Sequence, residues 1–261
     1  MEPSRRATLS VAIITLNEEA NLTRTLASVA WADDLVVVDS GSTDGTEAIA
    51  RTHGARFIRE PWRGFAAQKN LAIDLCTSDW VLSLDADEVV GPELAATIHR
   101  ALASAPSART AYSLARRNHF LGRWIRHGGY YPDAKLRLFP RGLARFPETP
   151  VHETVAFEGH VERLNGDLLH DAYPTLGGYL EHMQRYSTLG ADLAVERGHT
   201  GRGLFSFLNG VLLNPLVTFL YNYVVRLGML DGREGLLLHL YHSSYVSWKY
   251  AKAWEHARPR T

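Results

Sequence analysis

The first ninety residues alternate short apolar runs with segments of helical periodicity, and this alternation constrains the fold more than any other feature of the chain. Runs rich in Val, Ile and Leu are typical of strands buried on both faces. The sequence predicts strands over 9–16, at the start of 34–46, over 55–60 and over 79–88, and helices over 17–31, 46–53 and 65–76. Strands alternating with helices indicate an α/β fold with a mostly parallel, doubly wound sheet flanked by helices.

Polar side chains stand where three of these strands end. Thr15 closes the first strand, Asp39 the second, and Asp85 and Asp87 the fourth. In doubly wound sheets, ligands bind beyond the carboxyl ends of the strands. The "LSLDADE" stretch at 82–88 also places three carboxylates within four residues, which is unfavourable unless a cation, a proton or water relieves the repulsion. We therefore expect a ligand site at this edge, with a solvated acidic loop as the alternative.

Two common nucleotide-binding classes lack their motifs. A dinucleotide-binding Rossmann fold needs G-x-G-x-x-G after its first strand, yet "TLNEEANL" follows that strand without a glycine, and "GSTDGT" after the second does not fit. The chain also has no Walker A motif. Nicotinamide-dependent and ATP-hydrolysing enzymes are therefore disfavoured.

Composition indicates a globular protein with an uneven charge distribution. Hydrophobic residues make up 46% and charged residues 21% of the 261 residues, and the formal net charge is zero. Residues 1–110 carry 10 Lys/Arg against 15 Asp/Glu, whereas residues 111–261 carry 18 against 13. The single cysteine, Cys76, excludes an internal disulfide and fits a reducing compartment. Although Arg5-Arg6 and an apolar run resemble a signal peptide, no small-residue cleavage site follows, and we expect a cytoplasmic protein.

Four motifs carry a resemblance to a known family. They are "TLNEE" at 15–19, "VVVDSGSTDGT" at 36–46, "AQKNLAI" at 67–73 and "LSLDADE" at 82–88. In this order and spacing they resemble the nucleotide-binding half of family-2 inverting glycosyltransferases, which have the GT-A fold. The resemblance implies that Asp85-Ala86-Asp87 is the D-x-D element, which holds a divalent cation on the diphosphate of a sugar nucleotide. Asp87 would hold Mg²⁺ or Mn²⁺, and Asp85 would contact the ribose or the metal.

The same resemblance implies residues around the nucleotide sugar, namely Thr15, Glu18 and Asp39 at the base and ribose, Asp44 shaping that pocket, and Lys69 with Asn70 near the phosphates. Three positions have simpler interpretations. Asp44 equally suits a turn before Gly45, and Lys69 suits a solvated helix face. For Glu88, a surface position is favoured.

The middle of the chain is basic. Residues 115–146 hold eight Arg/Lys and a single acidic residue, Asp133, with aromatic residues between them. Nucleic-acid binding is one interpretation, but the balanced total charge and the sugar-nucleotide motifs favour a pocket for the donor diphosphate and an anionic acceptor. Trp124, Tyr130 and Tyr131 suit either sugar stacking or the core.

Inverting transfer needs a general base for the acceptor hydroxyl. "FPETPVHETV" at 146–155 resembles the base position of the lipopolysaccharide-core branch, so Glu153 is the first candidate and Asp133 the second. His152 would be a neighbouring metal or phosphate contact. His170 suits either a further ligand or an ordinary buried histidine.

The last third is helical in pattern. Residues 204–225 run without a charge, but a polar stripe recurs every fourth residue, at Ser206, Gly210, Asn214, Thr218 and Asn222. With Pro215, this stripe favours an amphipathic helix in the membrane surface, or one packed on the catalytic domain, over a transmembrane span. In 234–255, Tyr241, Tyr245 and Trp248 near two lysines suit either a lipid interface or a helix-bundle core. "GMLDGREG" at 228–235 resembles a linker of bacterial lipopolysaccharide-core glycosyltransferases.

These observations predict a metal-dependent inverting glycosyltransferase, peripheral on the cytoplasmic side of the inner membrane. It would move a hexose from a nucleotide diphosphate sugar to an envelope glycolipid, with the lipopolysaccharide inner core as acceptor and no nucleic-acid partner. Polyprenyl-phosphate or capsular polysaccharide transfer, and a non-catalytic sugar-nucleotide-binding protein, are the alternatives. We expect a nucleotide-sugar half over 1–110, an acceptor and base half over 111–175, and a helical extension over 176–261.

Overall fold

The computed structural model describes residues 6–104, 107, 109–147 and 154–258. The chain forms two compact units. The sheet unit comprises Met1–Arg116 and Asp133–His170, and the helical unit comprises Arg117–Pro132 and Asp171–Thr261. Strands from both sides of the predicted boundary at residue 110 belong to one sheet, and the predicted division at 110 and 175 stays a prediction.

The first half of the sheet unit has the predicted alternation. Its elements are β1 (Leu9–Thr15), α1 (Glu19–Ser28), β2 (Asp34–Asp39), α2 (Thr46–Thr52), β3 (Arg56–Arg59), α3 (Phe65–Asp74) and β4 (Trp80–Asp85). β1 pairs in parallel with both β2 and β4, and β2 pairs in parallel with β3. The register sets Thr15 opposite Asp39 and Ile14 opposite Asp85, so the polar strand ends share one edge.

The second half of the unit turns this sheet into a mixed one. The elements that follow along the chain are β5 (Glu88–Val90), α4 (Pro92–Ala103), β6 (Thr110–Phe120), β7 (Arg123–Trp124), β8 (Asp133–Pro140) and β11 (His160–Tyr173), of which β7 belongs to the helical unit. The strand order is β3-β2-β1-β4-β8-β6-β11-β5, with β7 on β6. β8 is antiparallel to β4 and to β6. β9 (Ala144–Arg145) and β10 (Ala156–Phe157) form a separate antiparallel pair. The predicted α/β class is confirmed.

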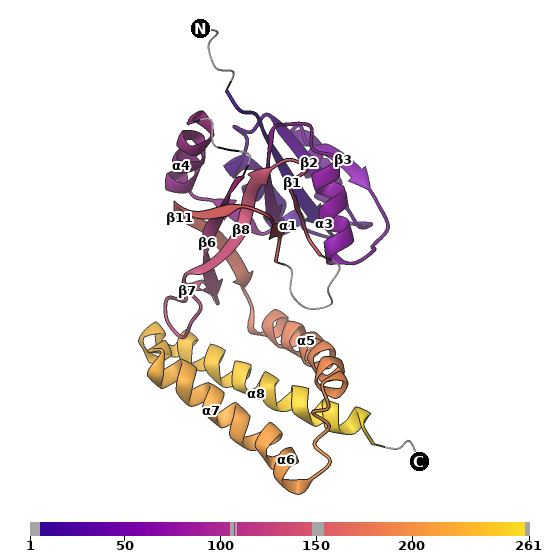
Figure 1. Cartoon of the computed structure of the whole chain (residues 1–261), viewed down its shortest axis with the longest axis vertical. Coiled ribbons are helices and arrows are strands. Elements are labelled where there is room, and N and C mark those ends of the chain that lie inside the picture. The colour runs from indigo at the N-terminus through magenta and orange to yellow at the C-terminus, as the bar shows by residue number, and fades with distance from the viewer. Residues whose placement is uncertain (1–5, 105–106, 108, 148–153, 259–261) are drawn as a thin grey trace. The chain divides into compact units, whose positions relative to one another are not determined.

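Both faces of the sheet are covered at β1, β2 and β4, which explains why these strands lack a polar face. On one face Val11 and Ile13 pack with Leu22 of α1 and Leu94 of α4, all fully buried. On the other face, Ala12 and Val38 lie in a second core cluster with Ile73 of α3. Figure 1 shows α4 and α3 on opposite sides of the strands. The strand ends are therefore held by a rigid, layered core.

The helical unit contains three long helical stretches. They are α5 (Leu176–Glu196), the continuous run of α6 (Leu204–Leu208), η1 (Asn209–Leu213), α7 (Asn214–Leu220) and η2 (Tyr221–Val225), and α8 (Gly232–His256), which follows the short η3 (Gly228–Asp231). α8 packs along α5 on one side and along the Leu204–Val225 run on the other (Figure 1). η1 and η2 are π-helical turns.

The aromatic residues of α8 contribute to this packing. Tyr241, Tyr245 and Trp248 are half-buried against a cluster that contains Tyr179 and Met183 of α5. The sequence left a lipid interface or a helix-bundle core open for them, and the structure places them in the bundle core.

Candidate functional site

The site is built where β1, β2 and β4 end. Thr15 is buried, and its Oγ1 donates a hydrogen bond to Asp39 Oδ1 across the parallel pair at 3.1 Å. Asp39 is completely buried and also accepts from the backbone N–H groups of Gly41 and Ser42 at 2.9 and 2.8 Å. Gly41 has φ +106°, a conformation that glycine adopts at little cost. Asp39 therefore shapes the turn that follows β2.

Asp44 joins the same turn to the starts of two helices. Its carboxylate accepts from the backbone N–H groups of Glu19 and Thr46, both at 3.1 Å, and from Thr46 Oγ1 at 2.5 Å. The Thr46 side-chain hydrogen bond is the main reason that the pKa of Asp44 is lowered. These are the contacts of a turn residue, and a ligand contact for Asp44 stays a prediction.

Asp85 is held by two buried cations. Its Oδ1 lies 2.9 Å from Lys69 Nζ, and its Oδ2 lies 2.6 Å from the guanidinium of Arg137. Burial alone would raise the pKa of Asp85, yet the charges of Arg137 and Lys69 hold it well below its ordinary value. Lys69 is itself only 5% exposed and lies 5.2 Å from the Phe146 ring centroid. The interpretation of Lys69 as a solvated helix residue is therefore wrong.

Glu88 continues this ion-pair network into the core. Its carboxylate is fully buried and lies 2.8 Å from Arg137 and 3.4 Å from Arg116. Glu88 also accepts a hydrogen bond from the backbone N–H of Asp85 at 2.9 Å, which fixes the start of the acidic loop. The surface position favoured from sequence is wrong, because β8 and β6 supply arginines that compensate the burial of this charge.

Asp87 has a different partner. Its Oδ2 lies 3.3 Å from Nε2 of His170 on β11, and the two side chains are 27% and 16% exposed. Burial alone would lower the pKa of His170, but the hydrogen bond to Asp87 and the charges of Asp87 and Glu88 raise it. A carboxylate oxygen and an imidazole nitrogen thus face each other at the partly open end of the site.

Glu18 adds negative charge to this end of the sheet. Burial raises the pKa of Glu18, the charges of Asp87, Asp44 and Asp85 raise it further, and a hydrogen bond from Asn21 opposes them. Among the described residues, His, Cys, Asp and Glu side chains form no group of three or more that could hold a metal ion. Protein ligands to a cation would therefore be few at this site.

Asp133 takes part in the arginine network. It receives two hydrogen bonds from the Arg116 guanidinium, at 2.5 and 2.9 Å, and lies 3.0 Å from Lys135 Nζ. Burial alone would raise the pKa of Asp133, but Arg116 and Lys135 lower it. A carboxylate held in this way is a weak proton acceptor.

Glu153 and His152 lie outside the described residues. The chain before and after them packs in the core, since Phe146 and Val155 both belong to the core cluster beside α3. Asn70 fixes Phe146 through two hydrogen bonds, from the Phe146 backbone N–H and to its carbonyl, at 2.9 and 2.8 Å. Asn70, expected near the phosphates, thus positions the segment that leads to Glu153.

The aromatic residues of the basic segment are largely packed within the helical unit. Arg117 and Arg126 stack on Trp124, with guanidinium carbons 4.1 and 4.5 Å from the ring centroid, and Tyr131 meets Trp124 edge-on. Tyr130 joins the Tyr179 cluster, and burial raises the pKa of its hydroxyl. This arrangement favours the core interpretation for Tyr130.

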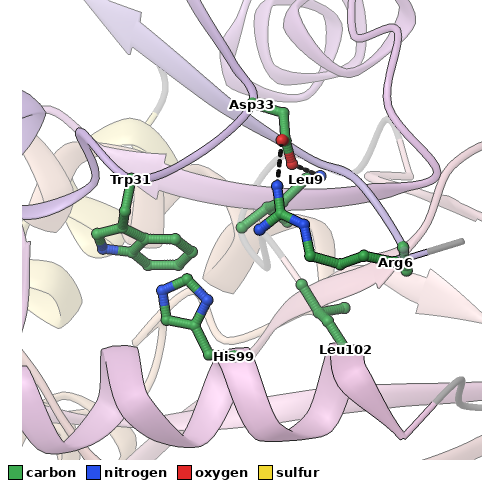
Figure 2. A pocket seen from close by; sticks show the side chains of 7 residues that line it. Arg6, Leu9, Trp31, Asp33, His99 and Leu102 are labelled. Carbon is green, nitrogen blue, oxygen red and sulfur yellow. Dashed lines mark hydrogen bonds and ion pairs between the residues drawn. The ribbon is translucent and has the colours of Figure 1, made fainter.

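A small hollow elsewhere in the sheet unit belongs to the opposite edge of the sheet. Figure 2 shows it lined by Arg6, Leu9, Trp31, Asp33, His99 and Leu102. Leu9 opens β1, so this hollow lies at the amino end of that strand. Asp33 is occupied by Arg6 and by the backbone N–H of Leu9. The hollow is therefore separate from the strand-end site at the carboxyl ends of the strands.

Sequence reasoning did not single out Arg137 and Arg116, although both lie in the basic segment. The available signal was "KLRLFP", where an arginine stands inside an apolar strand. A charge in such a position needs a buried partner. Asn17, just beyond β1, adopts φ 56° and its side-chain oxygen accepts from the Thr43 backbone N–H at 2.9 Å, which ties the first two strand-end loops together.

Known proteins and a family model that are similar to this chain are glycosyltransferases. The Glycosyl transferase family 2 model matches residues 10–156. The lipopolysaccharide core biosynthesis glycosyltransferase LpsC of Rhizobium meliloti (strain 1021) is 36% identical over 206 residues, which are 74% of each chain. A glycosyltransferase of Rickettsia typhi is 34% identical over 241 residues, or 88% of this chain and 80% of that one.

Among solved structures, a mannosyltransferase is similar over nearly the whole chain. It is the mannosyltransferase PcManGT from Pyrobaculum calidifontis, in complex with GDP-Man and Mn²⁺. The TM-score is 0.54 at 18% identity, with 98% of this chain and 89% of that chain covered. At this identity the likeness concerns the fold, and it confirms the GT-A type expected from sequence.

Proposed function

Because this chain belongs to glycosyl transferase family 2, and is therefore a glycosyltransferase, we propose that it moves a hexose from a nucleotide diphosphate sugar to an envelope glycolipid with inversion. The observation that carries the proposal is the strand-end site. There, Lys69 and Arg137 neutralise Asp85, while Asp87 and His170 present an oxygen and a nitrogen side by side.

We propose Asp87 and His170 as the protein ligands of a divalent cation. Hard cations such as Mg²⁺ and Mn²⁺ take carboxylate oxygens, and the mannosyltransferase of similar fold was solved with Mn²⁺. Two protein ligands suffice if diphosphate oxygens and water complete the shell. When bound, the cation would stabilise the negative charge of the departing phosphate.

Asp85 takes a different role in this proposal. Its two oxygens are already bound to Lys69 and Arg137, so it is better placed to orient the donor ribose than to hold the metal. Thr15, Glu18 and Asp39 would line the base and ribose pocket. Lys69 would add positive charge near the phosphates. The two aspartates of the D-x-D element thus have different roles in the proposal: Asp85, paired with Lys69 and Arg137, orients the ribose, and Asp87, beside His170, binds the metal.

Glu153 is the proposed base. The acceptor oxygen attacks the anomeric carbon while the bond from that carbon to the phosphate oxygen breaks, and Glu153 takes the proton of the acceptor hydroxyl. Support comes from the place of Phe146, seven residues before Glu153: its ring lies beside Lys69, which in turn binds Asp85. Asp133 is a poorer choice because Arg116 and Lys135 hold its negative charge.

The proposed acceptor is the lipopolysaccharide inner core, at the cytoplasmic surface of the inner membrane. The relative from Rhizobium meliloti is named for lipopolysaccharide core biosynthesis and is similar over three quarters of each chain. An acceptor glycolipid would meet the site only at a membrane surface.

Asp87→Asn tests the proposal. The variant should lose transfer by at least about a hundredfold, since metal stabilisation of the leaving group is worth several kcal/mol. Transfer from a panel of nucleotide sugars to a core-lipid extract is measured with and without excess EDTA, and Mn²⁺ binding is followed by electron paramagnetic resonance. Asp74→Asn is the matched control, because Asp74 is an exposed carboxylate paired with Arg145. Full wild-type activity in excess EDTA would refute the metal, and binding of sugar nucleotides without hydrolysis or transfer would refute the enzyme.

A further inference from the structure

The Leu204–Val225 run exposes its apolar side chains. By length and composition it is the one helical stretch among the described residues that could cross a membrane, yet only 11% of its most apolar window is buried. Its outer face includes Phe205, Leu212, Leu216, Val217 and Val225, which are 53–80% exposed. Helices of soluble proteins normally turn such residues inward. A contiguous outer face of this kind marks an interaction surface.

The polar stripe of the same run is turned toward α8 from Gly210 onward, whereas Ser206 near the start of the run is exposed. Gly210 is buried so closely that an added Cβ would lie 3.0 Å from the Tyr250 side chain. The Val211 carbonyl accepts a hydrogen bond from Ser247 Oγ at 2.9 Å, and Asn214 and Thr218 are half-buried. The helix is therefore amphipathic in the inverse sense: its polar side packs inside the unit and its apolar side is left outside.

The charges beside the outer face have one sign. Arg202 and Arg226 stand at its two ends and are both exposed, with 22 uncharged residues between Gly203 and Arg226. No acidic residue occurs from 197 to 230. The run is about 33 Å long at 1.5 Å per residue. If the helix lies in the plane of the membrane, the arginines at both of its ends can contact headgroups of the same lipid leaflet. Arginines at the ends of an apolar helix suit anionic headgroups.

We propose that the outer face docks on an anionic bilayer surface, with the helix lying in the plane of the interface and its apolar side chains among the acyl chains. This deepens the proposed function and rests on it only for the acceptor, because docking itself needs no transfer activity. In this orientation the helix lies on the membrane surface, although its length and composition alone would also allow a helix that spans the membrane.

A spanning orientation conflicts with the packing of the helical unit. α8 lies along the run and carries Lys249 and Lys252, and α5 lies along α8. Lys252 Nζ donates to Ser187 Oγ and Thr188 Oγ1 of α5, at 2.7 and 2.9 Å. Pushing the run across the bilayer would carry these charged helices into hydrocarbon or break their packing.

A second copy of the chain is also a poor occupant for the outer face. Two such faces packed antiparallel would set Arg202 of one copy beside Arg226 of the other. Like charges so placed disfavour association. An anionic lipid surface has the complementary charge at both ends.

Flotation of the full-length protein with liposomes tests the docking. Wild type should float with vesicles of phosphatidylcholine containing phosphatidylglycerol, and less with phosphatidylcholine alone. Leu212→Glu with Val217→Glu should lower partitioning at least about tenfold, because two exposed apolar side chains that would enter the acyl chains become charged. Arg202→Glu should lower it about thirtyfold on the anionic vesicles, because the change of two charges is worth ~1 kcal/mol per charge and ~1.4 kcal/mol is a factor of ten. Val161→Glu, a 45% exposed position in the sheet unit, is the matched control and should float like wild type.

Three further readouts decide the proposal. Carbonate at high pH should release the bound protein, and resistance to it would establish a spanning helix and overturn the in-plane orientation. Sedimentation that shows a stable dimer with no liposome binding would overturn the lipid occupant. Donor hydrolysis without membranes should be equal in wild type and Leu212→Glu/Val217→Glu. A variant that no longer floats but still hydrolyses the donor would support docking by the outer face without bearing on catalysis. A wild-type protein that does not hydrolyse the donor would contradict the proposed function and leave the docking result unaffected.

Discussion

At the residue scale, Arg137 stabilises the buried carboxylates at the end of β4. Arg137 is 4% exposed, and its guanidinium bridges Asp85 and Glu88 at 2.6 and 2.8 Å. Arg137→Met would leave two carboxylates buried with less compensation. Removing one partner of a buried ion pair typically costs about 3–5 kcal/mol. We expect the free energy of unfolding, measured by urea denaturation, to fall by that amount.

Arg145→Met is the control for this prediction. Arg145 also pairs with an aspartate, Asp74, but both side chains are at least half exposed. Exposed pairs contribute about 0–1 kcal/mol. If the two variants were equally stable, the buried network would not be what supports the acidic loop.

The base is the second prediction at this scale. Glu153→Gln keeps the side-chain shape but cannot take the acceptor proton, so turnover should fall about 10²–10⁴-fold with donor affinity nearly unchanged. Asp133→Asn should slow transfer less, because Asp133 is already bound by Arg116 and Lys135. Transfer rates and donor binding are measured for both. A dead Asp133→Asn enzyme beside a nearly normal Glu153→Gln enzyme would move the base to Asp133.

At the element scale, the linker between η2 and α8 depends on a close approach to one histidine. A Cβ on Gly228 would lie 2.2 Å from Nε2 of His239, which is 1% exposed. Burial and the nearby His242 lower the pKa of His239 to about 4, so its ring is neutral at physiological pH. Glycine at position 228 of "GMLDGREG" thus allows the His239 ring to pack directly against the backbone.

Gly228→Ala should therefore destabilise the helical unit. Overpacking a closed site costs about 1–3 kcal/mol, and thermal unfolding measures the loss. Gly203→Ala is the matched control, because no atom lies within 4 Å of the added Cβ and its φ of −100° suits any residue. A Gly228→Ala protein as stable as Gly203→Ala would show that the His239 contact relaxes freely.

At the scale of the whole molecule, the proposed acceptor can be tested by the composition of lipopolysaccharide in cells. Cells that lack this protein should make a lipopolysaccharide core shorter by one hexose, together with whatever is attached beyond it. Mass spectrometry of the core from cells with and without the protein measures this, and Asp87→Asn in place of wild type should give the shortened core. An unchanged core beside an altered polyprenyl-linked or capsular sugar would redirect the acceptor while leaving the family intact.

Local sequence determined the first half of the sheet unit and the chemistry at its edge. Strand and helix periods are properties of consecutive residues, so β1 to β4 and α1 to α3 lie where the apolar patterns predict. The parallel register then follows, and it brings Thr15, Asp39 and Asp85 to one edge. Family membership was likewise readable, because its motifs are short and contiguous.

Tertiary structure alone decided how the charges and faces are used. Glu88 looked like a surface residue because its partners, Arg116 and Arg137, stand 28 and 49 positions away in strands β6 and β8. The polar stripe of the Leu204–Val225 run was visible in the sequence, but its direction was not. A helical period fixes which residues share a face, and only the packing of α8 against Gly210 and Val211 determines which face is left to the solvent or a membrane.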